Sequence, residues 1–395
     1  MSAEIIKITH IIPSPKLGGV QTNLLLKSNY DKNYNISRKV IYTVSCTGEL
    51  LDSGNKLFER YIYCPIMPED MGHRPYRLFK LFRKWLSIFF VFRLFIILKR
   101  DDAKIVHSED SLKLVSQFVA AFFAGKKFIW QLHTSQTILS KFIIKHLFYF
   151  FIKKGIITMI ADSKAALQAN FSNMDEIINK VYFIQPGIEP AKFSKTQYNK
   201  IDIRRKFGFS EKDLIIGSTG RLHWAKGYNL LLESIKMITI NKKIKCKLVI
   251  AGDGPLKSKL MQQIKALDLT THVTLLGSIH DIVEFLTMLD FYVQPSLSEG
   301  FPISVIEAMA ARIPLLCSNA GGLPELIEDG EMGIIIDKND VYALTQGLIK
   351  LIYTKNNIMM KMVEKGYQRA YQYSTESVVK KDLSVYRTLL KQAVL

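Results

Sequence analysis

The sequence contains 395 residues, of which 48% are hydrophobic and 23% charged, so its composition excludes a disordered chain and predicts two folded domains. The formal net charge of +19 is concentrated in residues 1–200, where 29 Lys and Arg face 15 Asp and Glu, and it predicts an anionic partner for that half. The four cysteines lack the paired spacing of a metal site, so we expect reduced thiols in a cytoplasmic protein; the N-terminus lacks the pattern of a signal peptide.

The first half of the chain alternates predicted strands and helices. A strand at 5–12 leads into a loop with Gly18 and Gly19, followed by a helix from about residue 20 to 29. The two glycines let backbone approach a ligand, although a plain tight turn is an equally good interpretation. Further strands are predicted at 39–44, 60–63, 103–107, 127–132, 156–161 and 180–184, with helices at 75–99, 111–124, 138–153 and 163–172. This alternation predicts a mainly parallel sheet with helices on both faces.

Residues 76–100 form a basic, aromatic-rich amphipathic stretch, and residues 141–154 repeat the pattern. From residue 71 to 100 there are eight Lys and Arg and no acidic residue, and the apolar run is too short to span a bilayer. Such a helix suits the interface of an anionic membrane, although packing on the sheet with a solvated basic rim remains an alternative. No nucleic-acid motif accompanies the charge, so we expect no nucleic-acid partner. The predicted membrane-binding residues are Arg77, Lys80, Arg83, Lys84 and Trp85.

His133 directly follows the predicted strand at 127–132. Ligands bind at the carboxyl ends of strands in open α/β sheets, so His133 is a candidate site residue. A lone histidine there is more often structural, and the bare sequence leaves both interpretations open.

A second series of strands and helices begins after a domain boundary near residues 186–200. The expected strands lie at 214–219, 247–251, 273–276, 291–294, 314–317 and 333–337, each followed by a loop and, for most, a helix. Residues 182–193 are expected to form a connector with Pro and Gly, and residues 192–212 are polar. Residues 341–395 are expected to be helical, with a terminal helix at 374–390.

The stretch from Pro295 to Ala311 carries the clearest chemical signal. A short strand runs into a small-residue loop, and Pro302 suits the first turn of the helix that follows. The N–H groups and dipole at that helix start can hold phosphate, with Glu299 in the loop and Glu307 about one turn into the helix. Because both carboxylates can accept hydrogen bonds from hydroxyls, this stretch predicts a site for a nucleotide sugar.

Arg221 and Lys226 lie in one loop, after the strand at 214–219. Two fixed cations beside a helix start suit a diphosphate, although two solvated surface cations are the alternative from these residues alone. The chain has no Asp-x-Asp pair, which a metal-dependent sugar-diphosphate enzyme is expected to show. We therefore expect a site with no metal and no cofactor, in which the two cations and the helix amides neutralise the diphosphate.

Four motifs occur in order in the second half, and Glu299 and Glu307 have the spacing E-x7-E. The motifs are Gly220-Arg221 with Lys226-Gly227, Ala251-Gly-Asp-Gly-Pro255, Glu299-Gly-Phe-Pro with Glu307-Ala308, and Gly321-Gly-Leu-Pro-Glu325. Through them, residues 214–340 resemble the retaining glycosyltransferases of family 4, and the first half matches more loosely through Gly18, Gly19 and His133. The resemblance implies an α/β GT-B fold, with two Rossmann-like domains facing each other across a cleft. These would be residues 1–186, on which the helix at 374–395 would pack back, and residues 187–373.

The resemblance also implies roles for individual residues. Arg221 and Lys226 would hold the diphosphate, Glu307 the ribose hydroxyls, and Glu299 the donor sugar. The catalytic set would be Glu299, Arg221, Lys226 and His133, with His133 touching the sugar. Further donor contacts are implied for Gly18 and Gly19 and for the backbone of Ile279, Gly300, Phe301, Pro302 and Ile303.

These observations predict a retaining glycosyltransferase that moves a sugar from a nucleotide diphosphate, with UDP favoured. We expect a lipid-linked glycan acceptor, a place on the inner face of the cell membrane, and a product used in bacterial surface polysaccharide. One alternative is the same chemistry on a soluble acceptor. Another is a non-catalytic protein that binds an anionic surface or nucleic acid, which the intact Glu299, Glu307, Arg221 and Lys226 argue against. A GT-B-like epimerase is a third, disfavoured by the E-x7-E spacing.

Overall fold

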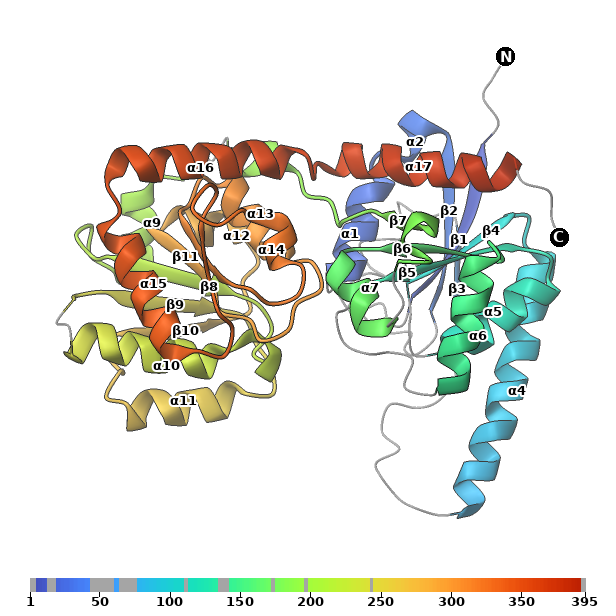
Figure 1. Ribbon diagram of the computed structural model, residues 1–395, viewed down its shortest axis with the longest axis horizontal. Helices are drawn as coiled ribbons and strands as arrows, with labels where there is room; N and C mark the ends of the chain where they lie inside the picture. The colour runs from blue at the N-terminus through green and yellow to red at the C-terminus, as the bar shows by residue number, and fades with distance from the viewer. Residues whose placement is uncertain are drawn as a thin grey trace. The chain divides into compact units, whose positions relative to one another are not determined.

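The chain folds as two compact units, which we call unit 1 (Met1–Gly187 and Thr375–Leu395) and unit 2 (Ile188–Ser374) (Figure 1). The computed structural model describes residues 5–12, 19–42, 60–63, 77–109, 113–133, 142–171, 175–194, 198–241 and 244–391. Each unit has its own parallel sheet, with helices packed on both faces.

The sheet of unit 1 has seven strands in the order β3-β2-β1-β4-β5-β6-β7, and all neighbours pair in parallel. The direction in which strands are added reverses between β1 and β4. In open parallel sheets, ligands bind outside the carboxyl ends of the strands at such a reversal. The strands are β1 (Ile6–Ile12), β2 (Ile36–Tyr42), β3 (Arg60–Tyr63), β4 (Ile105–Ser108), β5 (Lys127–Leu132), β6 (Ile157–Ala161) and β7 (Val181–Phe183).

Helices cover both faces of this sheet because successive strand residues point to opposite sides. Val106 packs in a cluster with α4, α5, α6 and α7, whereas Ile105 packs with the C-terminal helix α17. The helices of unit 1 are α1 (Gly19–Ser28), α2 (Asp31–Tyr34), α4 (Arg77–Arg100), α5 (Leu114–Phe123), α6 (Phe142–Lys153), α7 (Lys164–Asn170) and α17 (Thr375–Lys391), with a short 3-10 helix at Ile178–Lys180.

The sheet of unit 2 has six parallel strands in the order β10-β9-β8-β11-β12-β13, with the reversal between β8 and β11. The strands are β8 (Ile215–Thr219), β9 (Lys247–Ala251), β10 (Val273–Gly277), β11 (Phe291–Gln294), β12 (Leu315–Ser318) and β13 (Ile334–Ile336). The helices are α8 (Pro190–Ser194), α9 (Lys200–Lys206), α10 (Tyr228–Lys236), α11 (Lys257–Ala266), α12 (Ile282–Thr287), α13 (Ile303–Ala310), α14 (Leu323–Leu326), α15 (Val341–Tyr353) and α16 (Asn356–Tyr371), with a 3-10 turn at Trp224–Lys226 and a π-helical turn at Met237–Asn241.

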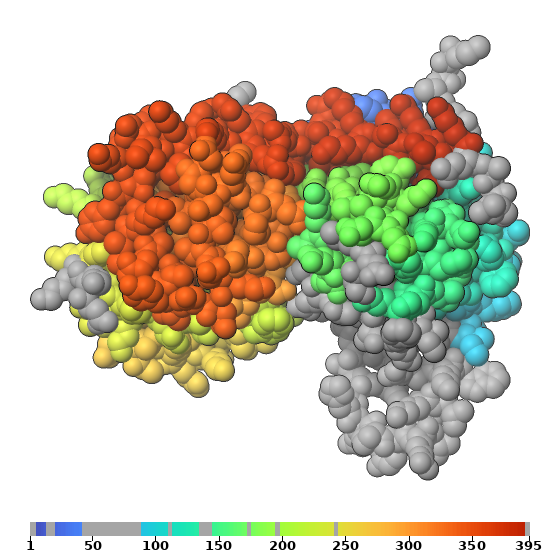
Figure 2. All heavy atoms as spheres, in the orientation of Figure 1, coloured from blue at the N-terminus to red at the C-terminus, as the bar shows by residue number. Residues whose placement is uncertain are grey.

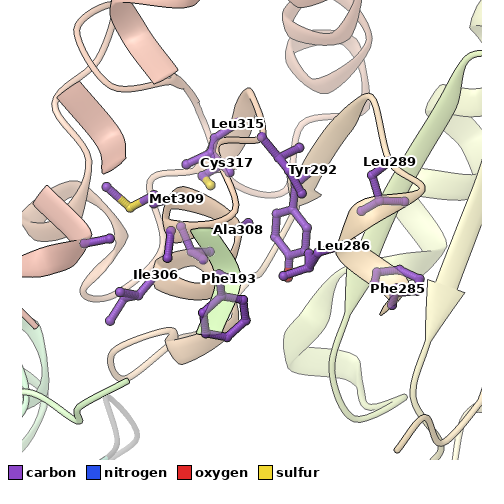
Figure 3. Close-up of a cluster of buried hydrophobic side chains, with 14 of the residues drawn as sticks. Phe193, Phe285, Leu286, Leu289, Tyr292, Ile306, Ala308, Met309, Leu315 and Cys317 are labelled. Carbon is purple, nitrogen blue, oxygen red and sulfur yellow. The ribbon is translucent and has the colours of Figure 1, made fainter. Parts of the chain in front are cut away.

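One core cluster of unit 2 fixes helix α13 against the sheet (Figure 3). Ile306 and Met309 on α13 are buried with Tyr292 of β11 and Cys317 of β12. Burying side chains of this size stabilises the unit by about 1.5–3 kcal/mol each. Helix α13, whose start lies between the two glutamates of the E-x7-E motif, is therefore held by core packing.

The structure confirms the predicted β/α alternation, with differences at some bounds. Strand β2 begins at Ile36, earlier than the expected residue 39. Pro302 is the N-cap of α13 rather than part of its first turn, and Ile303 is the first helical residue. The polar stretch at 192–212, for which no helix is predicted, contains α9. Its N-cap Asn199 accepts a hydrogen bond from the Ile201 N–H, and this capping signal is visible in the sequence.

Candidate active site

The loop after β8 and the loop after β11 are joined at the carboxyl edge of the unit 2 sheet. The Ala225 carbonyl accepts hydrogen bonds from the backbone N–H groups of Leu297, at 2.7 Å, and Ser298, at 3.2 Å. The loop after β12 joins them, because the Gly322 N–H donates to the Gly300 carbonyl at 3.1 Å. Three loops that are far apart in sequence therefore form one surface around Glu299.

Glu299 accepts several hydrogen bonds on one carboxylate oxygen. Lys226 Nζ lies 2.8 Å from Glu299 Oε2, and Ser296 Oγ lies 2.9 Å from the same oxygen. Gln294 Nε2 donates to that oxygen at 3.3 Å and to Ser296 Oγ at 2.8 Å. The Lys226 and Glu299 side chains are only 19% and 13% exposed, so solvent screens this ion pair weakly.

Two glycines allow the loops to approach this closely. Gly321 has a φ of +52°, and a Cβ atom there would lie 1.7 Å from the Glu299 carbonyl oxygen. Gly227 has a φ of +66°, and a Cβ atom there would lie 2.1 Å from the Pro295 carbonyl oxygen. Only glycine combines a positive φ with this little space. The glycines of the Lys226-Gly227 and Gly321-Gly322 motifs thus position the Glu299 loop.

Glu307 lies on α13, between the buried Ile306 and Ala308, and is itself partly exposed. Its carboxylate has no hydrogen-bond or ion-pair partner among the described residues. Burial raises the pKa of Glu307 to about 7, with Lys192 on α8 opposing the shift. An acceptor held without a partner in this way is available to ligand hydroxyl groups.

The other predicted donor residues lie on the same edge of unit 2. Arg221 follows β8, is exposed, and forms no ion pair with any described residue. Ile279 follows β10 and packs partly buried against the core. Phe301 is buried against Tyr373, with ring centroids 5.3 Å apart, so it supports the loop from inside. The first N–H groups of α13 begin at Ile303 and have no carbonyl partner within the helix.

In unit 1, His133 lies between two carboxylates at the carboxyl edge of the sheet. Its Nδ1 is 2.9 Å from Asp162 Oδ2, and its Nε2 is 3.5 Å from Glu109 Oε2. Glu109 directly follows β4, His133 follows β5 and Asp162 follows β6, which are adjacent strands. Burial by itself would lower the pKa of His133, but Asp162, together with Glu109, raises it to about 10.

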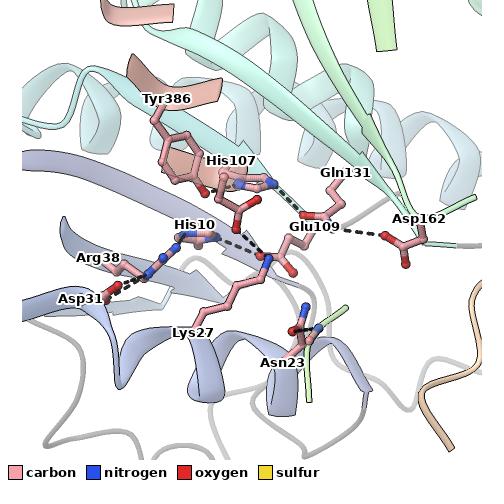
Figure 4. Close-up of polar contacts among 12 residues, drawn as sticks. His10, Asn23, Lys27, Asp31, Arg38, His107, Glu109, Gln131, Asp162 and Tyr386 are labelled. Carbon is pink, nitrogen blue, oxygen red and sulfur yellow. Dashed lines mark hydrogen bonds and ion pairs between the residues drawn. The ribbon is translucent and has the colours of Figure 1, made fainter. Parts of the chain in front are cut away.

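Further hydrogen bonds hold both carboxylates (Figure 4). His107 Nε2 lies 3.0 Å from Gln131 Oε1, and Gln131 Nε2 donates to Asp162 Oδ1 at 3.2 Å. On the other side, His10 Nδ1 lies 2.9 Å from Glu109 Oε1. Burial would raise the pKa of Glu109, but the hydrogen bonds from His10 and His133 bring it well below its usual value. Both carboxylates are therefore fixed in position by hydrogen bonds.

His10, His107 and Glu109 are also close enough to hold a metal ion, with ligand atoms within 4.8 Å of one another. Each histidine nitrogen already has another partner, however: Arg38 Nη1 lies 2.8 Å from His10 Nε2, and the Tyr386 hydroxyl lies 3.0 Å from His107 Nδ1. Burial lowers the pKa of both histidines, so both are neutral at pH 7. Hydrogen bonding alone accounts for this arrangement.

Sequence reasoning missed Glu109, Asp162, Gln294 and Ser296. Glu109 and Asp162 follow their strands as His133 does, so the rule that selects His133 also selects them. Gly19 begins α1, whereas Gly18 lies outside the described residues. Helix α4 covers the five predicted membrane-binding residues, but their side chains, at 77–87, also lie outside the described part.

Residues 199–369, nearly all of unit 2, match the family model described as glycosyl transferases group 1. The chain is similar to a UDP-Gal:alpha-D-GlcNAc-diphosphoundecaprenol alpha-1,3-galactosyltransferase of Escherichia coli, with 31% identity over 46% of this chain and 48% of that one. It is also similar to an N-acetyl-alpha-D-glucosaminyl L-malate synthase of Bacillus anthracis, with 26% identity over 52% of this chain and 56% of that one. The chain thus spans about half the length of the curated relatives it matches.

Solved structures extend the likeness to both units. A glycosyltransferase from Rickettsia africae superposes with a TM-score of 0.81 at 20% identity, over 98% of this chain and 100% of that one. The Anabaena protein HepE in complex with UDP and glucose superposes with a TM-score of 0.76 at 18% identity, over the same shares. At these identities the likeness shows the fold alone. This chain therefore has the GT-B fold, and most of its second unit matches the model of the glycosyl transferases group 1 family.

Proposed function

We propose that this protein is a retaining glycosyltransferase of family 4 that moves a sugar from a nucleotide diphosphate donor, with UDP favoured, to a lipid-linked glycan. The observation that carries the proposal is the weakly screened Lys226–Glu299 pair beside the start of α13, within the matched family segment. A cation, a carboxylate and helix amides are what a sugar diphosphate requires for binding.

Arg221 and Lys226 would neutralise the diphosphate as it leaves, without a metal ion. Arg221 has no competing partner among the described residues, so its guanidinium is available for a bidentate contact with phosphate. Lys226 has Glu299 as its partner and is therefore positioned before the donor binds. Charge that is fixed in advance stabilises a leaving group without reorganisation at the moment of reaction. The partnerless Glu307 would accept hydrogen bonds from the ribose hydroxyls.

Retention would follow from attack on the face that the diphosphate leaves, through an oxocarbenium-like transition state. Glu299 is a candidate for an enzyme nucleophile, but its Oε2 accepts hydrogen bonds from Lys226, Ser296 and Gln294. Hydrogen bonds from three donors stabilise the carboxylate and weaken it as a nucleophile. Glu299 would instead orient the donor sugar. A covalent sugar adduct on any side chain would contradict this assignment.

The acceptor is proposed from the chemistry of the relatives and of unit 1. The E. coli relative acts on a diphosphoundecaprenol acceptor, and a similar Campylobacter jejuni protein, 28% identical over 52% of this chain and 55% of that one, is an N-acetylgalactosaminyltransferase for a diphospho-undecaprenol substrate. Both names describe lipid-linked glycans. Such an acceptor, used in bacterial surface polysaccharide synthesis, would place the reaction at a membrane surface.

Unit 1 carries an apolar patch that suits such a surface. The patch consists of Ile88, Phe89 and Phe92 on α4 with Phe122 and Phe123 on α5, and each of these side chains is more than half exposed. Ile88, Phe92 and Phe123 also line one groove of about 360 Å³. The sequences of α4, α5 and α6 contain no acidic residue, whereas α4 ends in Lys99 and Arg100. Figure 2 shows atoms of α5 and α6, in teal and green, at the surface of unit 1.

This arrangement favours an anionic lipid surface as the partner of unit 1. The opposite side of α4 is buried in the core of unit 1, next to α5, through Phe90, Leu94 and Leu98. Both faces of the helix are therefore apolar, and only one has a partner in the described structure. An exposed apolar face with basic residues around it suits lipid headgroups and the acyl boundary. Among the described residues, no helix combines the length and the apolar content that a bilayer-spanning segment needs.

The decisive experiment is a panel of UDP- and GDP-sugars, assayed with a crude bacterial lipid extract as the acceptor source. We expect one donor to release its nucleotide and to label the lipid fraction with the anomeric configuration retained. The Lys226→Met variant is the control for contaminating hydrolases and should release at least about a hundredfold less nucleotide. Absence of turnover with every donor, at matched folding by circular dichroism, would overturn the proposed function.

A further inference from the structure

The two carboxylates around His133 decide which protons this histidine carries. A neutral imidazole has one N–H group and one lone pair, so it can satisfy a carboxylate at only one of its two nitrogens. Here Asp162 faces Nδ1 at 2.9 Å and Glu109 faces Nε2 at 3.5 Å. A lone pair at either nitrogen would face a carboxylate oxygen and be repelled. Both contacts, the Nδ1 hydrogen bond to Asp162 and the longer Nε2 ion pair with Glu109, are favourable only when both nitrogens carry hydrogen.

Both carboxylates act as hydrogen-bond acceptors toward the rest of the network, so neither has a proton to share with His133. His10 is neutral and accepts from Arg38 at Nε2, so its single N–H, at Nδ1, donates to Glu109. Gln131 accepts from His107 through its oxygen, so its amide nitrogen donates to Asp162. Each carboxylate thus accepts a hydrogen bond from behind on one oxygen and presents its other oxygen to His133.

We propose that Glu109 and Asp162 are positioning residues that hold His133 as a permanent imidazolium, so that His133 offers its ligand a fixed positive charge and never accepts a proton. Among the described residues, the charged or titratable groups that face this cluster are His10 on β1 and His107 on β4, together with Arg38 on β2, Lys27 on α1 and Tyr386 on α17 behind them. The Glu109 and Asp162 side chains are 2% and 5% exposed, whereas 19% of the His133 side chain is exposed although its Nε2 atom is buried. Of the three side chains, a ligand therefore reaches the imidazole ring of His133 most easily.

The consequence for turnover rests on the proposed function. The sequence resemblance assigns His133 a contact with the donor sugar. A histidine there without the two carboxylates would lose its positive charge near pH 6.5. Because Glu109 and Asp162 hold it as an imidazolium, His133 keeps one charge state across the neutral pH range. It can stabilise negative charge that develops on a substrate, but it cannot take a proton from an acceptor hydroxyl. A general base, if one is needed, must be another group.

The direct test is a ¹⁵N NMR titration of the histidine rings of the full chain, with the His133 signals assigned by their loss in His133→Gln. We expect both His133 nitrogens to show the shift of a protonated ring nitrogen from about pH 6 to about pH 9, in line with the pKa of about 10. The Asp162→Asn variant should lower the midpoint by about 1–3 pH units. The matched control is Glu176→Gln, which removes an exposed carboxylate elsewhere in unit 1 and should change nothing.

The proposal is overturned if wild-type His133 titrates near pH 6.5 or is neutral at pH 7.5. If Asp162→Asn fails to fold, Glu109→Gln tests the other nitrogen, and the wild-type titration needs neither. In assays, Asp162→Asn should gain a pH dependence, with kcat falling as pH rises through the new midpoint, and Asp162→Glu should restore the flat profile. A purely structural role would lower kcat by one factor at every pH. Because the NMR result does not depend on turnover, failure of the proposed transferase function would leave it unaffected.

Discussion

Lys226 and Glu299 form a 2.8 Å ion pair although 73 residues separate them. The pair joins the loop after β8 to the loop after β11, and its atoms are mostly withdrawn from solvent. We predict that Lys226→Met lowers kcat/KM for the donor at least about a hundredfold, because it removes a positioned charge from the leaving diphosphate. Steady-state kinetics with the donor identified by the panel provide the measurement.

The matched control for Lys226→Met is Lys257→Met. Lys257 also forms a 2.8 Å ion pair with an acidic residue, Asp253, but both side chains of this pair are about half exposed. Exposed pairs contribute about 0–1 kcal/mol, so this variant should keep its activity within a few-fold. Equal losses in the two variants would mean that the Lys226 effect reflects general surface charge.

Gly321 provides a test of loop positioning that is independent of charge. Replacing it by Ala would place a Cβ atom 1.7 Å from the Glu299 carbonyl oxygen, at a φ of +52°. Gly330 has a similar φ of +75°, but a Cβ atom there would meet nothing within 4 Å. We predict that Gly330→Ala costs about 1 kcal/mol of unfolding free energy, from backbone conformation alone.

Gly321→Ala should cost clearly more than Gly330→Ala and should also lower donor turnover, because the Glu299 loop must move away. Urea unfolding followed by fluorescence gives the two free energies, and the donor assay gives the rates. If both variants lose the same stability and Gly321→Ala keeps full activity, the close contact between these loops has no part in positioning Glu299.

The loops around Glu299 and the rest of the fold differ in how much of their structure the sequence predicts. The strand-to-helix alternation is predictable because apolar runs of strand length, such as residues 127–132, are separated by glycine and proline signals. The Lys226–Glu299 contact follows from parallel strands whose carboxyl ends share one edge. The hydrogen bonds that Gln294 and Ser296 donate to Glu299 could not be predicted in the same way, because they depend on side-chain directions within one turn.

The contacts of both His133 ring nitrogens with Glu109 and Asp162 could not be predicted from the sequence either. Glu109 and Asp162 lie far from His133 in the sequence, and only the strand order β4-β5-β6 makes them neighbours. The sequence places each residue at a strand end, but it does not state that both ring nitrogens face carboxylates. Strand order in a parallel sheet is a tertiary property, so no local pattern carries it.

Glu307 should make donor affinity depend on pH. Its pKa of about 7 means that the free protein holds a mixture of acid and carboxylate near neutrality. The carboxylate accepts hydrogen bonds from two ribose hydroxyls better than the acid does, so affinity should rise from pH 6 to pH 8. Without ligand the sign is the reverse: a folded-state pKa above the unfolded value favours the protonated fold, so stability falls as pH rises from 4.5 to 7.

Calorimetric binding of a UDP-sugar measures this dependence, since its diphosphate has no group that titrates near neutrality. In Glu307→Gln the affinity should be lower, by about tenfold or more, and constant across the same range. Glu328→Gln, which removes an exposed carboxylate of unit 2, is the control and should retain the wild-type profile. A wild-type affinity that is flat with pH, or unchanged affinity in Glu307→Gln, would remove Glu307 from the ribose site.

The apolar patch of unit 1 predicts binding to anionic vesicles. Phe92 is 59% exposed on α4 and Phe123 is 69% exposed on α5, and both line the same groove. Inserting a phenylalanine into the acyl boundary contributes about 1.5–3 kcal/mol, so Phe92→Ala and Phe123→Ala should each weaken vesicle binding about tenfold or more. Tyr353 on α15 is 70% exposed in unit 2, and Tyr353→Ala is the matched control that should bind as the wild type does.

Flotation with phosphatidylcholine vesicles, with and without phosphatidylglycerol, separates the two forces involved. Basic residues around the patch should make binding stronger on the anionic vesicles and weaker at high salt, whereas the apolar contribution should persist in salt. Equal binding to neutral and anionic vesicles would assign the interaction to the aromatic residues alone. If the wild type floats with neither, the patch serves another partner, and a soluble acceptor becomes the better choice for the same transferase chemistry.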